Sequence, residues 1–181
     1  MTLYSIILFL HLLGALILFT AFGLEWICLR QLRQAASLEQ FRSWTGAAAL
    51  IPRFHAFSGP LILFPGAYLA TKMQVWPQGW LSMSLLAALI MIVLGAGVTG
   101  RPMRALIKAS TQAESSLMDL VARARGGVFR LSLRLRLALG LAAVFLMGSK
   151  SPWGIAVTVM GVAAVIGIVL GLMGGKRAAA V

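Results

Sequence analysis

The sequence predicts an all-α fold: a polytopic transmembrane bundle of about five spanning helices, forming a single integral membrane domain over residues 1–181. Hydrophobic residues make up 60% of the chain and charged residues only 11%, a composition typical of integral membrane proteins. A spanning helix needs roughly 20 predominantly apolar residues. Stretches of this kind predict spans at about 3–28, 46–71, 80–99, 127–148 and 153–174.

The basic residues predict the orientation of the bundle. The chain holds 16 Lys and Arg against 4 Asp and Glu, a formal charge of +12 that in a soluble protein would suggest a nucleic-acid partner. Here the basic residues fall in alternate links, whereas the opposite links "KMQVWPQGW" and "GSKSPW" hold one lysine each and carry tryptophan. By the positive-inside rule we expect an N-out, C-in protein of the bacterial inner membrane, with no nucleic acid as partner.

The first span, 3–28, contains two titratable groups. His11 and Glu25 share a helix face with small residues such as Gly14, and ionisable groups in a membrane almost always face the interior of the bundle. For His11 two interpretations stay open: a hydrogen bond inside the bundle or a functional role. Cys28 is the single cysteine, which excludes an internal disulfide and indicates a buried small hydrophobe.

The second span, 46–71, is bent by proline and supplies partners for the first. Its residues Arg53 and His55 come out near the depth of Glu25, in the cytoplasmic third. We expect a structural ion pair between Glu25 and Arg53, because each would otherwise be unpaired in lipid. The alternative is that Glu25 orients the imidazole of His55, as a carboxylate does near a metal site.

A haem bound by both histidines is disfavoured by their depths. His11 lies in the outer half of the membrane, roughly 10 Å from His55 along the membrane normal at helical rise. Proline kinks could close part of this gap, or each histidine could serve its own site with a different second ligand. Met91, on the third span at 80–99, lies near the depth of His55 but is more typical of core packing.

The link before the fourth span predicts a short amphipathic helix at the cytoplasmic interface, at about 111–125. Thr111 and Glu114 have capping-box spacing, and glycines 126 and 127 end the pattern. Arg123 and Arg125 would then lie near anionic lipid headgroups. The alternative is a cytoplasmic extension of the fourth span.

The fourth span, 127–148, opens with several arginines. Arg130 and Arg134 share a face at i, i+4, whereas Arg136 points away. One interpretation is that they snorkel to the headgroups. The other is an anion clamp for a propionate, a phosphate or a lipid headgroup.

The fifth span, 153–174, carries a small-xxx-small pair, Gly167 and Gly171, that suits close helix packing. The partner helix belongs either to this chain or to a second copy or larger membrane complex. The sequence holds no phosphate loop, Cys/His zinc pattern or nucleophile triad, so any chemistry must lie within the membrane.

Residues 1 to about 107 resemble a known group of membrane proteins. The likeness rests on "LHLLGA" around His11, Arg53 and "SGP" in the second span, "GWL" at the start of the third and "GRPMRAL" at its end. This order is similar to the HemJ-type protoporphyrinogen oxidase group, the copper-resistance D membrane domain and uncharacterised bacterial multi-pass membrane proteins. The resemblance implies a helical bundle that can bind b-type haem, with His11 in the position of the first-helix histidine. Ser84 stands where the HemJ group carries a lysine, which argues against protoporphyrinogen oxidation.

These observations are compatible with three functions. The first is a redox protein that binds haem b or a porphyrin through His11 or His55, with Arg130 and Arg134 on the propionates. The second is a non-catalytic membrane subunit or assembly factor, and the third is a small-solute or metal permease. The third is weakened because the chain has no repeats, paired broken helices or clustered Met and His ligands.

Overall fold

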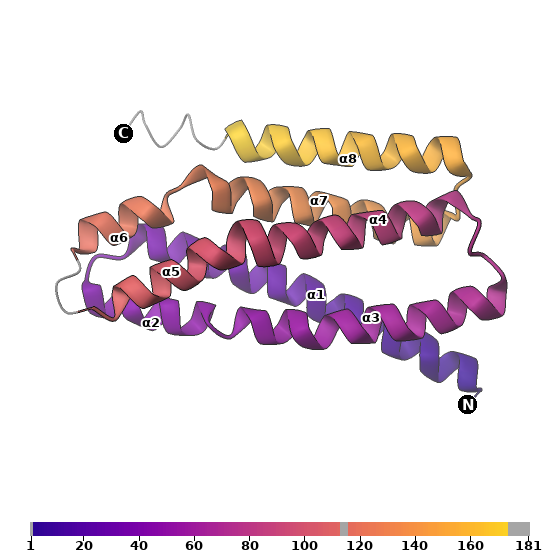
Figure 1. The fold of residues 1–181 in the computed structure, drawn as a ribbon, viewed down its shortest axis with the longest axis horizontal. Helices are drawn as coiled ribbons and strands as arrows, with labels where there is room; N and C mark the ends of the chain where they lie inside the picture. The colour runs from indigo at the N-terminus through magenta and orange to yellow at the C-terminus, as the bar shows by residue number, and fades with distance from the viewer. Residues whose placement is uncertain (1, 113–115, 174–181) are drawn as a thin grey trace.

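The chain folds into long helices joined by short links (Figure 1). The computed structural model describes residues 2–112 and 116–173. In chain order the elements are α1 (Leu3–Gln34), α2 (Leu38–Ala48), α3 (Ile51–Met73), α4 (Gly79–Val93), the π-helix η1 (Leu94–Thr99), α5 (Gly100–Ser110), α6 (Leu117–Ala124), α7 (Gly127–Ser149) and α8 (Trp153–Met173).

Five helical stretches within the described residues are long and apolar enough to cross a membrane. They are Leu3–Gln34, Leu38–Met73, Gly79–Ser110, Leu117–Ser149 and Trp153–Met173. The predicted all-α bundle with five spans is thus confirmed, and the chain is a multi-pass membrane protein. Position 174, the predicted end of the fifth span, lies outside the described residues.

The first four spans extend further toward the basic links than predicted. The first ends at Gln34, and the fourth begins at Leu117. The second begins at Leu38, where α2 precedes α3 with a break at Ala49 and Leu50. The third continues through η1 and α5 to Ser110, so "GRPMRAL" is helical and does not form a link. The reason is that η1 joins α4 to α5 without interrupting the helix, and Pro102 sits in the first turn of α5, where its missing N–H is tolerated.

The predicted interfacial helix at 111–125 starts later than expected. Thr111 is the C-cap of α5, and its hydroxyl donates to the Lys108 carbonyl at 2.8 Å, so it ends one helix and does not begin the next. Ser116 is the N-cap of α6, and Glu114 lies outside the described residues. α6 packs on α1 and α5 and buries Leu120.

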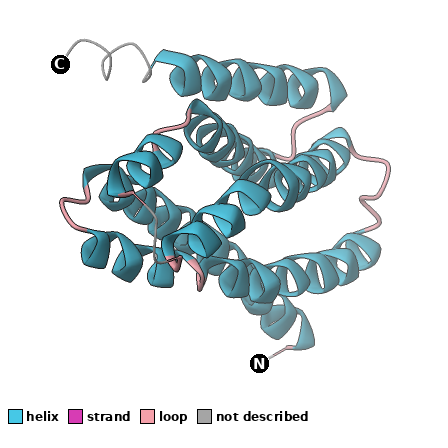
Figure 2. Ribbon diagram, turned by 60° about the vertical axis from the view of Figure 1, so that its left-hand side comes forward, coloured by secondary structure: helices cyan, strands magenta, loops and turns pink. Residues whose placement is uncertain are grey.

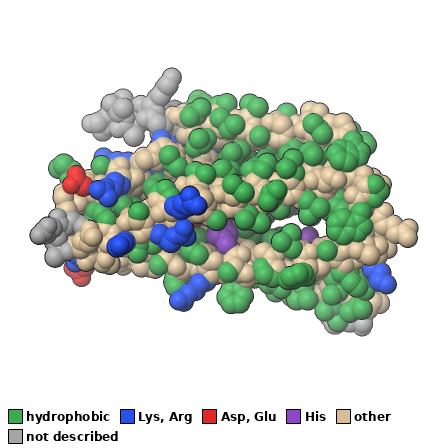
Figure 3. All heavy atoms as spheres, in the orientation of Figure 1, with side chains coloured by type: hydrophobic (Ala, Val, Ile, Leu, Met, Phe, Trp, Pro, Cys, Tyr) green, Lys and Arg blue, Asp and Glu red, His purple; other side chains and the backbone are tan. Residues whose placement is uncertain are grey.

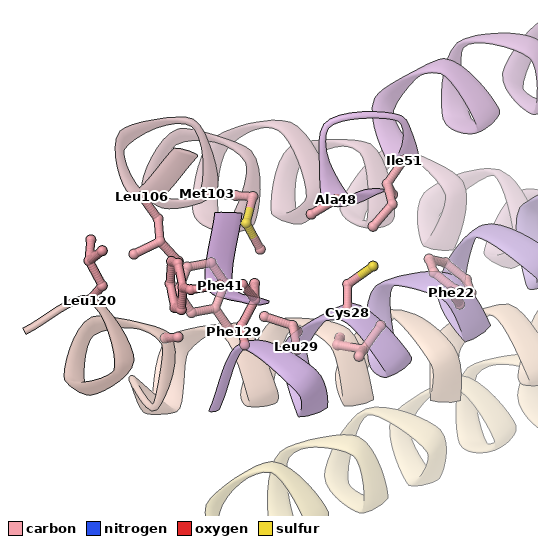
Figure 4. Close-up of a cluster of buried hydrophobic side chains, with 13 residues drawn as sticks. Phe22, Cys28, Leu29, Phe41, Ala48, Ile51, Met103, Leu106, Leu120 and Phe129 are labelled. Carbon is pink, nitrogen blue, oxygen red and sulfur yellow. The ribbon is translucent and has the colours of Figure 1, made fainter. Parts of the chain in front are cut away.

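One end of the bundle gathers α2, α5, α6 and the C-termini of α1 and α8 (Figure 1). We call it the arginine-rich end, after Arg33, Arg42, Arg104, Arg125 and Arg130. A cluster of buried apolar side chains fills this end, drawn from α1, α2, α3, α5, α6 and α7 (Figure 4). Cys28 is a member at 3% exposed, which confirms it as a buried hydrophobe.

The helices pack in two groups. α1 lies along α3, and α7 packs on α8, α4 and η1. Figure 2 shows α8, at the C-terminus, on the outside of the bundle. A methyl group placed on Gly14 of α1 would lie 2.8 Å from Leu61 Cβ of α3, so glycine is what permits this close approach. α3 has few contacts with α4 and α5, which separates the two groups along one side.

Candidate functional site: a cleft within the bundle

A cleft of about 470 Å³ opens between α3 on one side and α4, η1 and α5 on the other. α1 and α7 close it from behind with Phe22, Glu25 and Arg136. Its walls are mostly apolar, with Leu18, Ile51, Ile62 and Leu63 from the first group of helices and Ala88, Met91, Ile92, Met103 and Ile107 from the second. In the space-filling view, histidine side chains (purple) are visible between these two helix groups (Figure 3).

A buried ion pair lies at the back of the cleft. Arg136 Nη2 donates to Glu25 Oε1 at 2.5 Å, and the two side chains are only 2% and 5% exposed. The predicted pair of Glu25 with Arg53 is therefore wrong in its partner, because Arg53 lies on an exposed face of α3 while α7 brings Arg136 to α1. Each charge removes the cost of leaving the other alone in an apolar interior.

Neighbouring groups hold the Arg136 guanidinium in place. It lies 5.4 Å from the centroid of the Phe22 ring, and Nη2 is 3.5 Å from Thr99 Oγ1. Thr99 in turn donates to Ser132 Oγ at 2.7 Å. Gly95 leaves room for this side chain, since a methyl group there would lie 3.3 Å from Nη1. Arg136 Nε is buried with no hydrogen-bond partner.

η1 forms part of the same wall. Gly95, Ala96 and Thr99 of this π-helix line the cleft, and the Gly100 amide donates to the Gly95 carbonyl. π-helical turns are rare and frequently occur at functional sites, because they change which side chains of a helix face a given neighbour. Here the π-helix carries Thr99, which lies beside the Arg136 guanidinium, and Gly95, which leaves room for it.

His55 lies beside the ion pair and lines the cleft. Its ring centroid is 5.7 Å from that of Phe22, and its Nε2 is buried with no hydrogen-bond partner. Buried polar atoms in proteins are almost always hydrogen-bonded, so each exception needs an explanation. The expectation that Glu25 orients His55 is not what the structure shows, because the hydrogen bond of Glu25 goes to Arg136.

His11 lies elsewhere in the bundle. Its Nδ1 donates to the Ile62 carbonyl of α3 at 2.9 Å, and a methyl group on Gly66 would be 3.0 Å from its Cε1. Ile62 and Gly66 lie 7 and 11 residues after His55 on α3, which places them roughly 10 to 17 Å from it along the helix axis. The structure therefore does not bring the two histidines together, and it gives His11 the hydrogen bond inside the bundle that was one of its two interpretations.

Arg130 and Arg134 do not line the cleft. Arg130 Nε donates to the Gly171 carbonyl at 3.2 Å, and Arg134 Nη1 donates to the Leu170 carbonyl at 2.6 Å. A guanidinium can donate to backbone carbonyls, and its positive charge interacts favourably with the partial negative charge toward the C-terminal end of a helix. The two arginines thus hold the C-terminal part of α8. Neither of the two predicted roles, snorkelling to the headgroups or an anion clamp, describes this contact.

The same interaction recurs at the arginine-rich end. Arg33 Nε donates to the Ala124 carbonyl at the end of α6, and Arg42 Nε donates to the Ser110 carbonyl at the end of α5. Several of the basic residues that predicted orientation therefore also stabilise helix C-termini.

Two arginines at the cleft escaped the sequence reasoning. Arg136 points away from Arg130 and Arg134, and that difference was a usable signal, because an arginine off the snorkelling face must find a partner inside the bundle. Arg104 lines the cleft from α5 with its side chain exposed, in a segment expected to be a link.

Comparison with protein-family models, curated proteins and solved structures finds no match to this chain. The resemblance to the HemJ group therefore remains an expectation from short motifs. Within residues 2–112 and 116–173, no group of three or more His, Cys, Asp or Glu side chains is placed to hold a metal ion.

Proposed function

We propose that this membrane protein binds b-type haem, or a closely related porphyrin, in the cleft and has a redox role, with His55 as the iron ligand. The observation that carries the proposal is His55 Nε2, a buried atom without a protein partner in the wall of an apolar cleft. A neutral imidazole nitrogen with no hydrogen bond is available as an iron ligand.

The size and lining of the cleft support this proposal. Ligand sites are typically about 300 to 1,000 Å³, mostly apolar, with a few polar groups that set orientation, and the cleft meets this description at about 470 Å³. Met91 and Met103 also line it, and a thioether is a known second ligand of haem iron. When bound, haem would supply one-electron chemistry. The chain's own residues would ligate, orient and shield it.

The proposal does not use His11, Arg130 or Arg134. His11 is bonded to α3 at another level of the bundle, and the two arginines donate to carbonyls of α8. The subunit alternative drew support from Gly167 and Gly171, but both pack on α7 of the same chain, so that stripe gives no support for a partner helix. The permease alternative gains no specific observation.

A visible spectrum tests the proposal. Protein purified in detergent from haem-replete cells is expected to show a reduced-minus-oxidised haem b band, quantified as the pyridine haemochromogen. His55→Ala should lose the haem, while His11→Ala, the matched control, should retain it. A colourless wild-type protein would reject the proposal, and loss of haem in His11→Ala alone would move the ligand to the first helix.

We also propose that the arginine-rich end faces the cytoplasm and that the membrane is the bacterial inner membrane. The basic residues of the links lie at that end, and the positive-inside rule assigns such an end to the cytoplasm. Anionic headgroups of that leaflet would then lie near Arg123 and Arg125.

A further inference from the structure

The charges that line the cleft do not balance. The cleft is lined by Glu25, Arg136 and Arg104, and the first two neutralise each other in the buried pair. Arg104 remains as an additional positive charge. Within the described residues its side chain has no hydrogen bond or ion pair, and it is exposed at the rim.

The position of Arg104 on α5 places it between the cleft and the outer surface. Gly100, Met103 and Ile107 line the cleft from the same face of α5. Arg101 and Lys108 lie three residues before and four residues after Arg104, so they are its neighbours on the exposed side of the helix. Figure 3 shows basic side chains (blue) gathered on this part of the surface, close to a histidine side chain (purple).

No acidic side chain of the described residues offsets this basic rim. Glu25 is the only acid that lines the cleft, and it is paired with Arg136. Glu39 belongs to α2 and Asp119 to α6, and neither lines the cleft. An uncompensated positive charge at the mouth of an apolar cleft favours a ligand that carries a negative charge on an apolar body.

We propose that the cleft selects amphipathic anions, and that Arg104 binds the carboxylate of the ligand while the apolar body lies between α3 and α4. This inference rests on the proposed function and names the feature of the ligand that the cleft recognises. A guanidinium suits the role because it binds carboxylates through two parallel hydrogen bonds, and these charge-assisted bonds are stronger than neutral ones. Arg104 would therefore contact a haem propionate, in place of the predicted Arg130 and Arg134.

The test compares a ligand with and without its carboxylates. Wild-type protein from haem-deficient cells, in an uncharged detergent, is titrated with haemin and with haemin dimethyl ester, following the Soret band. Any Soret signal that persists in His55→Ala comes from ligand partitioned into detergent micelles, and it is subtracted. The acid-to-ester affinity ratio should fall about tenfold in Arg104→Gln, as expected for the loss of one charge-assisted hydrogen-bonded contact.

Arg123→Gln is the matched control, because this exposed arginine lies on α6 and does not line the cleft. Its affinity ratio should equal that of the wild type. An unchanged ratio in Arg104→Gln would overturn the inference while the proposed function stands, provided that both ligands bind through His55. If neither ligand gives a signal that depends on His55, the proposed function fails and the inference fails with it.

Discussion

At the scale of single residues, the buried ion pair of Glu25 and Arg136 is costly to disturb. Both side chains are almost fully buried, and Phe22 and Thr99 surround the guanidinium. A buried charge that loses its partner keeps its desolvation cost and loses the attraction that offset it. His55 lies beside this pair, so the pair also contributes to the shape of the cleft.

We expect Glu25→Gln to lower the free energy of unfolding by about 3 to 5 kcal/mol, because Arg136 is left buried without a counter-charge. Denaturation by SDS in mixed micelles measures this difference. Arg53→Gln, at the exposed arginine once expected to be the partner, should change the free energy by about 0.5 kcal/mol or less.

Two results would contradict this assignment. The first is equal destabilisation by Arg53→Gln and Glu25→Gln. The second is the absence of rescue in the double variant Glu25→Leu/Arg136→Met, since replacing both charges of a buried pair with apolar side chains is often neutral or stabilising.

At the scale of helices, glycines set how closely neighbours approach. A methyl group on Gly171 would lie 2.9 Å from Leu131 Cα, and one on Gly167 would lie 2.8 Å from Leu135 Cα. Both contacts are with the backbone of α7, which cannot move aside as a flexible side chain can. The small-residue pair seen in the sequence therefore joins α8 to α7 within one chain.

Gly171→Val is expected to push α8 away from α7 and destabilise the protein by about 1 to 3 kcal/mol, the usual cost of overpacking. Gly161→Val on the same helix is the control, because a methyl group there would meet no atom within 4 Å. Unfolding in mixed micelles should separate the two variants. Equal stability of both would show that α8 does not pack closely on α7.

Sequence reasoning worked well for the helices themselves and less well for their ends. Apolar length predicted every span, but the first four spans run past their apolar parts into the polar segments beside them. The spacing of Thr111 and Glu114 predicts a helix start, yet Thr111 ends α5, because a threonine hydroxyl can bond to backbone groups at either end of a helix. Which of the two roles a threonine plays depends on where the preceding helix ends.

At the scale of the whole molecule, the bundle has the arginine-rich end on one side and an end with few charged residues on the other. The arginines of the basic end also satisfy carbonyls at the ends of α5, α6 and α8. Because these contacts tie the basic residues to helix ends, the fold keeps their positive charge at the arginine-rich end.

Labelling of single cysteines tests the orientation. In a Cys28→Ser background, Lys72→Cys on α3 should react with a membrane-impermeant maleimide added to intact spheroplasts, because the proposed orientation places that end outside the cytoplasm. Arg123→Cys on α6 should react only after permeabilisation. The wild-type Cys28, which is buried, should label in neither case. The reverse pattern would invert the topology.

The membrane class, the spans and the burial of Cys28 and Glu25 follow from the sequence alone, because they depend on local apolar length and on the cost of a charge in lipid. The partner of Glu25 does not, because Arg53 and Arg136 both lie within reach in depth, and the choice depends on which helices pack beside α1. Tertiary packing also decides three other features: the cleft, the unpartnered Nε2 of His55 and the rim position of Arg104. They arise where α3 stays apart from α4 and α5, and that separation is a relation between helices distant in the chain, which no local pattern encodes.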